Sequence, residues 1–109
     1  MATKYDRGRA FEYKVRDTYK DNGYYVVRSA GSKGKVDLVA LKAGHRTHLI
    51  QCKAGAIASR ERKEAVELHA LAEELGCIGV LASKSKAGKL VLQYTADDAK
   101  DLETFDIAA

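Results

Sequence analysis

Gly31-Ser32-Lys33-Gly34-Lys35-Val36-Asp37-Leu38-Val39-Ala40, followed by Gln51-Cys52-Lys53, is the part of the sequence that decides the fold. The β-prone runs 36–41 and 48–53 flank a turn-tolerant segment around Gly44, and this pattern predicts a β-hairpin. A loop centred on Gly44 places position 37 opposite position 51, and directly opposed residues of an antiparallel pair point to the same face. Lys53 shares that face because side chains alternate along a strand. The hairpin therefore brings an acid, an amide and an amine together on one face of the sheet.

The composition fits one folded domain, which we expect to span residues 1–109. Hydrophobic residues make up 46% of the 109 residues, and 19 Lys and Arg against 15 Asp and Glu give a formal net charge of +4. Basic residues without acids occupy 28–35 beside flexible glycines. This favours an anionic polymer as the partner, and we expect no small-molecule substrate. The alternative is that these charges form a plain solvated surface.

Several classes of protein are disfavoured. Cys52 and Cys77 occur without CxxC spacing or a Cys/His cluster, which argues against a zinc site and against a disulfide framework. The apolar runs are strand-length, far below the ~20 residues that a membrane span needs, and the first residues are polar. We therefore expect an intracellular, cytoplasmic protein with no membrane partner, a description that includes a nucleoid-associated or virus-encoded one.

The hydrophobic periodicity predicts two main helices. The first runs over 7–21, with Asp6 as its cap, Asn22-Gly23 as its end, and a buried stripe of Phe11, Val15 and Tyr19. Glu12 lies on the flank of this buried face. The second runs over 59–75, ends at Gly76, and directs inward the residues Ala65, Leu68, Ala72 and Leu75.

The remaining segments read mostly as strands. We expect strands over 24–28, 77–82 and 89–94 in addition to the hairpin, and the continuous apolar run 77–82 is typical of a buried central strand. The segment 95–98 looks like the cap of a short C-terminal helix that carries Leu102 and Phe105. The expected order is α-β-β-β-α-β-β-α, an α/β fold with a mixed central sheet flanked by helices.

These motifs resemble those of the restriction-endonuclease-like nucleases of the PD-(D/E)xK superfamily, and within it the archaeal-type Holliday junction resolvases, which also occur in viruses. The resemblance is carried by Arg7-Gly8 with Glu12, the block Gly23 to Lys33, the run Val36 to Ala40, and Gln51-Cys52-Lys53. It is close over the first half of the chain, whereas the second half matches only in its layout. The resemblance implies a restriction-endonuclease-like fold and an endonuclease that nicks two strands of a four-way DNA junction.

The resemblance also implies an active site. Glu12 and Asp37 would hold a divalent metal, with Gln51 at the third ligand position and the backbone carbonyl of Cys52 beside it. Mg²⁺, for which Mn²⁺ can substitute, prefers such hard oxygen ligands and keeps several waters. A metal so held lowers the pKa of a bound water and neutralises charge on the phosphate. Lys53 would add a positive charge near the attacking water or a phosphate oxygen.

Basic residues around the expected site are candidates for binding the phosphate backbone of DNA. Arg28 ends a strand beside the glycine-containing loop, and family position and charge both favour phosphate binding there. The other candidates lie in that loop or near the N-terminus and are Arg7, Arg9, Ser32, Lys33 and Lys35. For Ser32, stabilising the turn is an equal alternative.

Position 51 departs from the resembled family, which typically has glutamate there. Glutamine keeps a carbonyl oxygen for the metal but removes one negative charge. A functional natural variant, an engineered inactivation and a natural non-catalytic binder all explain the change. If a third acid is recruited, the candidates are Glu61, Glu64 and Glu67 on the second helix, for which solvated helix charges are the alternative.

Two further readings of function stay open beside the resolvase: a non-catalytic module that binds branched DNA, and a related nuclease that acts on duplex DNA. The second is disfavoured because the sequence offers no appended element with which to read bases. A four-way junction presents two equivalent strands, so a two-fold homodimer is expected. Its interface is expected in the second half of the chain, from the helix 59–75 and the strand 77–82.

Overall fold

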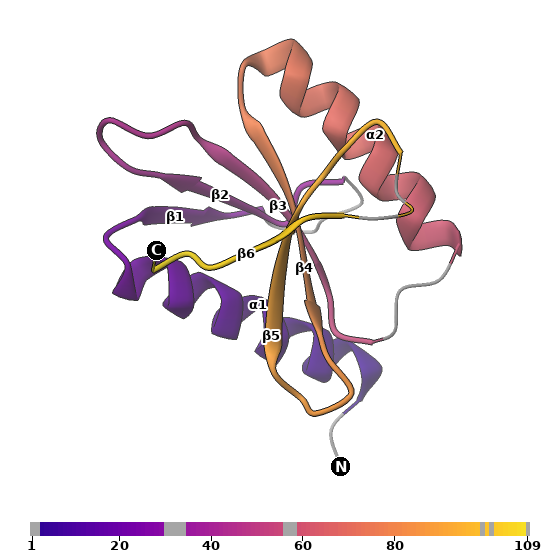
Figure 1. Cartoon of the computed structure of the whole chain (residues 1–109). Coiled ribbons are helices and arrows are strands. Elements are labelled where there is room, and N and C mark those ends of the chain that lie inside the picture. The colour runs from indigo at the N-terminus through magenta and orange to yellow at the C-terminus, as the bar shows by residue number, and fades with distance from the viewer. Residues whose placement is uncertain (1–2, 30–34, 56–58, 99, 101, 109) are drawn as a thin grey trace.

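The structure is a computed structural model that describes residues 3–29, 35–55, 59–98, 100 and 102–108. In these residues a mixed six-stranded sheet has the order β1-β2-β3-β4-β5-β6, and two helices lie on opposite sides of it (Figure 1). The elements in chain order are α1 (Lys4–Asp21), β1 (Tyr25–Arg28), β2 (Leu38–Leu41), β3 (His48–Lys53), α2 (Ser59–Leu75), β4 (Ile78–Lys84), β5 (Leu90–Tyr94) and β6 (Thr104–Phe105). The predicted α/β architecture is thus confirmed.

Helix α1 begins earlier than its sequence pattern predicts. Thr3, not Asp6, is the N-cap: the Asp6 backbone N–H donates to Thr3 Oγ1, and the Thr3 N–H donates to Asp6 Oδ2, each at 3.1 Å. This reciprocal capping box satisfies two of the N–H groups that a helix start leaves unpaired. Asn22 is the C-cap, as predicted, and Gly23 follows in the left-handed conformation with φ of 87°.

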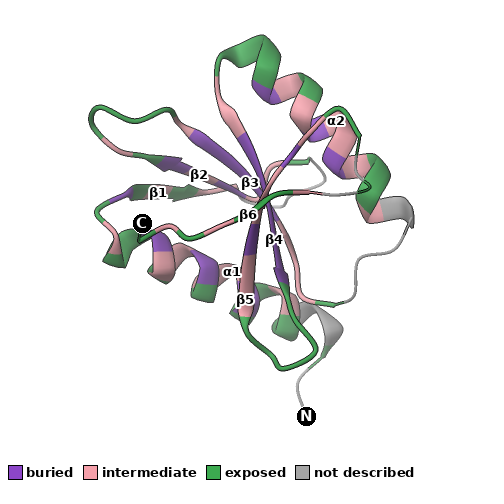
Figure 2. Ribbon diagram, in the orientation of Figure 1, coloured by how far each residue is buried: buried purple, intermediate pink, exposed green. Residues whose placement is uncertain are grey.

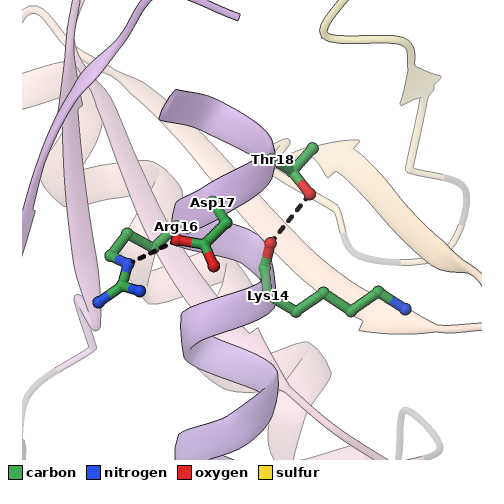
Figure 3. A network of polar contacts seen from close by, with 4 residues as sticks. All are labelled: Lys14, Arg16, Asp17 and Thr18. Atoms are coloured by element: carbon green, nitrogen blue, oxygen red, sulfur yellow. Dashed lines mark hydrogen bonds and ion pairs between the residues drawn. The ribbon is translucent and has the colours of Figure 1, made fainter. Parts of the chain in front are cut away.

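The outer side of α1 carries polar side chains that contact one another locally. Arg16 Nε lies 2.9 Å from Asp17 Oδ1, and Thr18 Oγ1 donates to the Lys14 carbonyl at 2.9 Å (Figure 3). The predicted stripe of Phe11, Val15 and Tyr19 is fully buried on the opposite side of the helix. α1 is therefore amphipathic. Burial of its apolar stripe sets the rotation of the helix about its axis, and this rotation places Glu12 at the flank of the buried side.

The sheet separates two apolar cores because alternate residues of each strand face opposite helices. Ile50 of β3 packs in the core under α1, whereas its neighbour Leu49 packs against Leu68 and Ala72 of α2. Figure 2 shows that buried residues concentrate on β3 and β4. The core under α1 also contains a polar residue, His48, whose Nδ1 shares a hydrogen bond of 2.8 Å with the Tyr19 hydroxyl.

The hairpin β2–β3 has the register that the sequence predicts. Leu38 pairs with Ile50 and Ala40 pairs with His48, so the loop is centred on Gly44, which has φ of 78°. Asp37 lies immediately before β2, and its backbone N–H donates to the Ile50 carbonyl at 2.8 Å. The backbone at position 37 is therefore held beside β3.

Helix α2 joins β3 to β4, which are parallel neighbours. α2 begins and ends where predicted, and Gly76 follows it with φ of 70°. Leu75, predicted to face inward, is instead exposed, because it is the last helical residue and lies beyond the core formed by Leu68 and Ala72. β4 lies between β3 and β5 and is almost wholly buried, so it cannot supply the exposed interface predicted for 77–82.

The predicted C-terminal helix is wrong: no helix occurs among the described residues after β5, and the last element is the strand β6. The Thr95 hydroxyl does not cap a helix but shares a hydrogen bond of 3.1 Å with His69 Nδ1 of α2. Phe105 stacks on Tyr94 with ring centroids 4.0 Å apart, and β6 pairs with β5. Pairing and stacking on the sheet edge outweigh the local helix signal in this segment.

One patch of apolar side chains is exposed near the β1 edge. Tyr25 and Val27 of β1 and Leu41 of β2 are 73%, 46% and 41% exposed. Tyr25 pairs directly with Leu41, so these side chains share one face of the sheet. α2 packs on β3 and β4 of that face and leaves β1 uncovered. In the described parts of the chain, neither helix has the length and apolar character needed to cross a bilayer.

Candidate active site

Two carboxylates from separate elements approach each other where α1 meets the start of β2. The Glu12 side chain, on the flank of α1, is only 16% exposed. Burial raises the pKa of Glu12, and the negative charge of Asp37 raises it further, although the Arg28 guanidinium opposes both effects. The distance between Arg28 Nε and Glu12 Oε1 is 3.2 Å. The two acids that the sequence predicts as metal ligands are therefore electrostatically coupled, as expected of a cation site.

Asp37 is oriented by the backbone of β3. The Cys52 backbone N–H donates to Asp37 Oδ2 at 2.8 Å, which fixes one carboxylate oxygen. Burial raises the pKa of the Cys52 thiol, and the charges of Asp37 and Glu12 raise it further. The thiol thus stays protonated, which leaves the backbone carbonyl of Cys52 as the group that the sequence predicts for a metal site.

Gln51 and Lys53 project from β3 toward α2, on the same face as Leu49. Gln51 Nε2 donates to Glu64 Oε2 at 2.7 Å, and Lys53 Nζ lies 3.0 Å from Glu61 Oε1. The sequence pointed to Glu61 and Glu64 only as possible recruits, without a partner for either. The structure brings both glutamates to the predicted hairpin residues.

The amide of Gln51 is only half satisfied. Gln51 is 8% exposed, and its Oε1 is the buried side-chain oxygen or nitrogen without a hydrogen-bond partner among the described residues. Most such groups in folded proteins find a partner, so an orphan of this kind needs an explanation, and a position available to a bound ion is one.

The donor set fits a hard divalent cation. Among the described residues, no three His, Cys, Asp or Glu side chains are grouped to hold a metal ion. Mg²⁺ does not need such a cage, because it is commonly bound through one or two carboxylates and retains water. Glu12, Asp37 and the orphan oxygen of Gln51 are oxygen donors of the kind that it prefers.

A pocket of about 620 Å³ opens beside these residues, between the start of α1 and the ends of β3 and β4. The cationic side chains that line it, among the residues that the structure describes, are Arg7, Lys53 and Lys84. Arg7 and Lys53 were predicted as site residues, whereas Lys84 was missed. Its only sequence signal is a lysine that follows the buried strand, and the parallel pairing of β3 with β4 brings it near Lys53.

The other predicted phosphate-binding residues are scattered around the site. Arg28 contacts Glu12 and lies 5.4 Å from the centre of the Tyr13 ring. Arg9 is exposed on α1; hydrogen bonds with Thr3 lower the pKa of Asp6, and the charge of Arg9 adds a smaller effect in the same direction. Lys35 forms an ion pair of 3.0 Å with Glu67 of α2. Ser32 and Lys33 lie outside the described residues.

Comparisons with known proteins bear on the family and the fold of the chain. The family model described as archaeal Holliday junction resolvase (Hjc) matches residues 3–107. Over 53 residues the chain is 42% identical to the crossover junction endodeoxyribonuclease Hjc of Methanocaldococcus jannaschii, a match that covers 49% of this chain and 38% of that relative. The fold is similar to the 1.6 Å structure of Archaeoglobus fulgidus Hjc, a Holliday junction resolvase, with a TM-score of 0.61 and 21% identity over 79% of this chain and 70% of that one.

Proposed function

The chain belongs to the archaeal Holliday junction resolvase family, and on that premise we propose that residues 1–109 form a nuclease domain that binds four-way DNA junctions and nicks two strands. The membership confirms the resemblance found in the sequence motifs. The mixed sheet between two helices is the restriction-endonuclease-like fold that the resemblance implied. DNA as the substrate implies, within this proposal, an intracellular site of action.

The observation that carries the proposal is the coupled pair Glu12 and Asp37, next to Lys53 and the cationic pocket. Burial and the negative charge of Asp37 raise the pKa of Glu12, so a bound cation would stabilise its ionised form, and a cationic pocket attracts a polyanion. A non-catalytic DNA-binding surface has no use for two carboxylates that repel phosphate. The arrangement therefore favours hydrolysis over binding alone.

The residues have distinct roles in this proposal. Glu12, Asp37, Gln51 Oε1 and the Cys52 carbonyl would hold a divalent metal, which membership of the family implies and which we propose to be Mg²⁺, with Mn²⁺ as a substitute. When bound, the metal lowers the pKa of a water and neutralises charge on the scissile phosphate. Lys53 adds a fixed positive charge where negative charge develops. Its ion pair with Glu61 holds the ammonium near the mouth of the pocket before DNA arrives.

The DNA backbone would be bound by point charges rather than by base readout. Arg7 and Lys84 flank the pocket, and Arg9, Arg28 and Lys35 extend the basic surface around it. Neither helix is placed as an appended element that could fill a groove, because each packs on the sheet. Recognition by the shape of a branched duplex follows from such contacts.

Two equivalent cuts need two sites, so the proposal includes a homodimer. The exposed patch of Tyr25 and Val27 on the edge strand β1, with Leu41 on β2, is the surface that best suits a second copy. An edge strand presents unpaired backbone groups, and a two-fold axis beside it would match the same apolar patch from both copies. This replaces the interface expected from the second half of the chain.

The experiment that tests the function is incubation of the protein with a labelled synthetic four-way junction, with and without Mg²⁺ or Mn²⁺. We expect paired nicks that require metal. Asp37→Asn, which keeps an oxygen to accept the Cys52 N–H, should reduce cleavage at least about a hundredfold while junction binding persists. Junction binding without cleavage at any metal concentration would support the non-catalytic module, and equal cleavage of linear duplex would support the duplex nuclease.

A further inference from the structure

The contact between Gln51 and Glu64 fixes how the amide of Gln51 is oriented. An ionised carboxylate only accepts hydrogen bonds, so the 2.7 Å contact must be made by the amide nitrogen. Rotating the amide by half a turn would place its oxygen against the carboxylate oxygen, which is repulsive. Glu64 therefore determines that Oε1 of Gln51 points away from α2.

The oxygen left by this orientation is the buried orphan of the site. Gln51 lies in the central strand pair, 8% exposed, and its Oε1 has no hydrogen-bond partner among the described residues. The hairpin register puts position 51 opposite position 37, and Asp37 binds the backbone of the next residue, Cys52. The orphan oxygen thus belongs to the same strand segment that orients the Asp37 carboxylate.

This inference rests on the proposed metal-dependent function. We propose that Glu64 is a positioning residue of the metal site, which holds and polarises the Gln51 amide so that Oε1 acts as the third ligand. A hydrogen bond from an amide N–H to a carboxylate draws electron density toward the amide oxygen, which strengthens it as a ligand for a hard cation. Through the amide, Glu64 supplies part of the negative charge that a glutamate at position 51 would carry.

Of the three glutamates spaced along this side of α2, Glu64 is the one that contacts Gln51. Glu61, Glu64 and Glu67 follow one another at three-residue intervals on α2, and each engages a different residue of the site region: Lys53, Gln51 and Lys35. Glu64 engages the predicted metal ligand, whereas Glu67 forms a half-exposed ion pair with Lys35. Glu67 thus offers a matched control for a change in charge on the same helix.

The test is a calorimetric titration of the protein with Mn²⁺ in the absence of DNA. Glu64→Gln keeps a side-chain oxygen that can accept from Gln51 but removes the charge, so we expect Mn²⁺ affinity to fall about tenfold or more. Glu67→Gln should leave the affinity unchanged. The exchanged pair, Gln51→Glu with Glu64→Gln, keeps one acid and one amide in contact and should restore the affinity to the wild-type value or above.

The melting temperature without metal separates positioning from plain structural support, and we expect Glu64→Gln to leave it unchanged. The inference is overturned if Glu64→Gln binds Mn²⁺ as wild type does, if Glu67→Gln weakens binding equally, or if the wild-type chain does not bind Mn²⁺. If Glu64→Gln binds Mn²⁺ more weakly but the wild-type protein does not cleave the junction, this inference is supported and the proposed function is contradicted. If the wild-type protein cleaves the junction but Glu64→Gln binds Mn²⁺ as tightly as the wild type, the proposed function is supported and this inference is contradicted.

Discussion

At the scale of single residues, His48 has an unusual environment for a group that titrates near neutral pH. It is buried among Tyr19, Tyr24 and Phe105, with ring centroids between 5.5 and 6.0 Å from its own. Burial lowers the pKa of His48 to about 4, and the nearby His45 contributes in the same direction. The imidazole is therefore neutral in the folded protein and bonded to the Tyr19 hydroxyl.

This environment predicts a pH dependence of stability. The unfolded chain binds a proton at His48 with the ordinary pKa of 6.5, whereas the folded chain resists protonation until about pH 4. The free energy of unfolding should thus fall as pH decreases from 6.5 to 4, by roughly 2–3 kcal/mol from this group. Urea denaturation across that range should show a shallower fall in His48→Gln, which does not titrate. His45→Gln, a change at an exposed turn residue, should keep most of the wild-type slope, because burial lowers the pKa of His48 more than His45 does.

The residues of the candidate site were predictable from the sequence to different degrees. Glu12 and Asp37 follow from local patterns, a helix stripe and a hairpin loop, which fix where each side chain points. The contact between Gln51 and Glu64 joins two elements and depends on how α2 rotates over β3. Sequence periodicity gives the inward face of a helix, but it does not give the residue of β3 that each flanking glutamate meets.

At the scale of elements, β4 includes a glycine that the packing requires. A Cβ added at Gly79 would collide with the side chain of Thr95. The backbone N–H of Thr95 donates to the Gly79 carbonyl, which holds the two residues close together. Gly79→Ala should therefore lower the free energy of unfolding by about 1–3 kcal/mol.

Gly8→Ala provides the comparison, because a Cβ there meets nothing within 4 Å. Alanine favours the helical backbone over glycine, so this change in α1 should raise the free energy of unfolding by up to about 1 kcal/mol. Urea denaturation of both variants gives the two values. A Gly79→Ala protein as stable as the wild type would show that β4 and the segment after β5 shift apart at little cost.

Element boundaries show where local signals suffice and where they fail. The hairpin register was predicted correctly because the loop is short and its length fixes the pairing. The C-terminal helix was wrong because segment 95–98 has a cap-like sequence but too few local contacts of its own. Tyr94, Phe105 and His69 supply long-range contacts that the local pattern does not contain.

The cationic pocket between α1 and β4 predicts how DNA binding responds to salt. Each phosphate neutralised on duplex DNA contributes about −0.9 to the slope of log affinity against log salt concentration. Lys84→Ala and Arg7→Ala should each flatten that slope by about this amount for a four-way junction. Lys20→Ala, at the other end of α1, should leave it unchanged. An unaltered slope in both pocket variants would remove the pocket from the DNA contact surface.

At the scale of the whole molecule, the uneven cover of the sheet predicts how copies associate. Tyr25 of the edge strand β1 is 73% exposed, and Leu75 is 59% exposed at the end of α2. If β1 forms the interface, Tyr25→Lys should convert a dimer to a monomer at micromolar concentration, because it places a positive charge from each copy in an apolar interface. Light scattering after size exclusion measures this. Leu75→Lys should remain dimeric. A dimeric Tyr25→Lys variant together with a monomeric Leu75→Lys variant would instead place the interface in the second half of the chain.

The order of the strands has a consequence for how the molecule folds. Each strand pairs with its neighbour in the chain, so most loops that must close are short, and the chain contains no proline to slow the process by isomerisation. The exception is the parallel pair β3–β4, which must wait until the long connection through α2 has closed. Because α2 also carries Glu61 and Glu64 to the hairpin, the docking step that completes the core is the step that completes the site. A partly folded chain can therefore contain Glu12 and Asp37 in place and still lack a finished metal site.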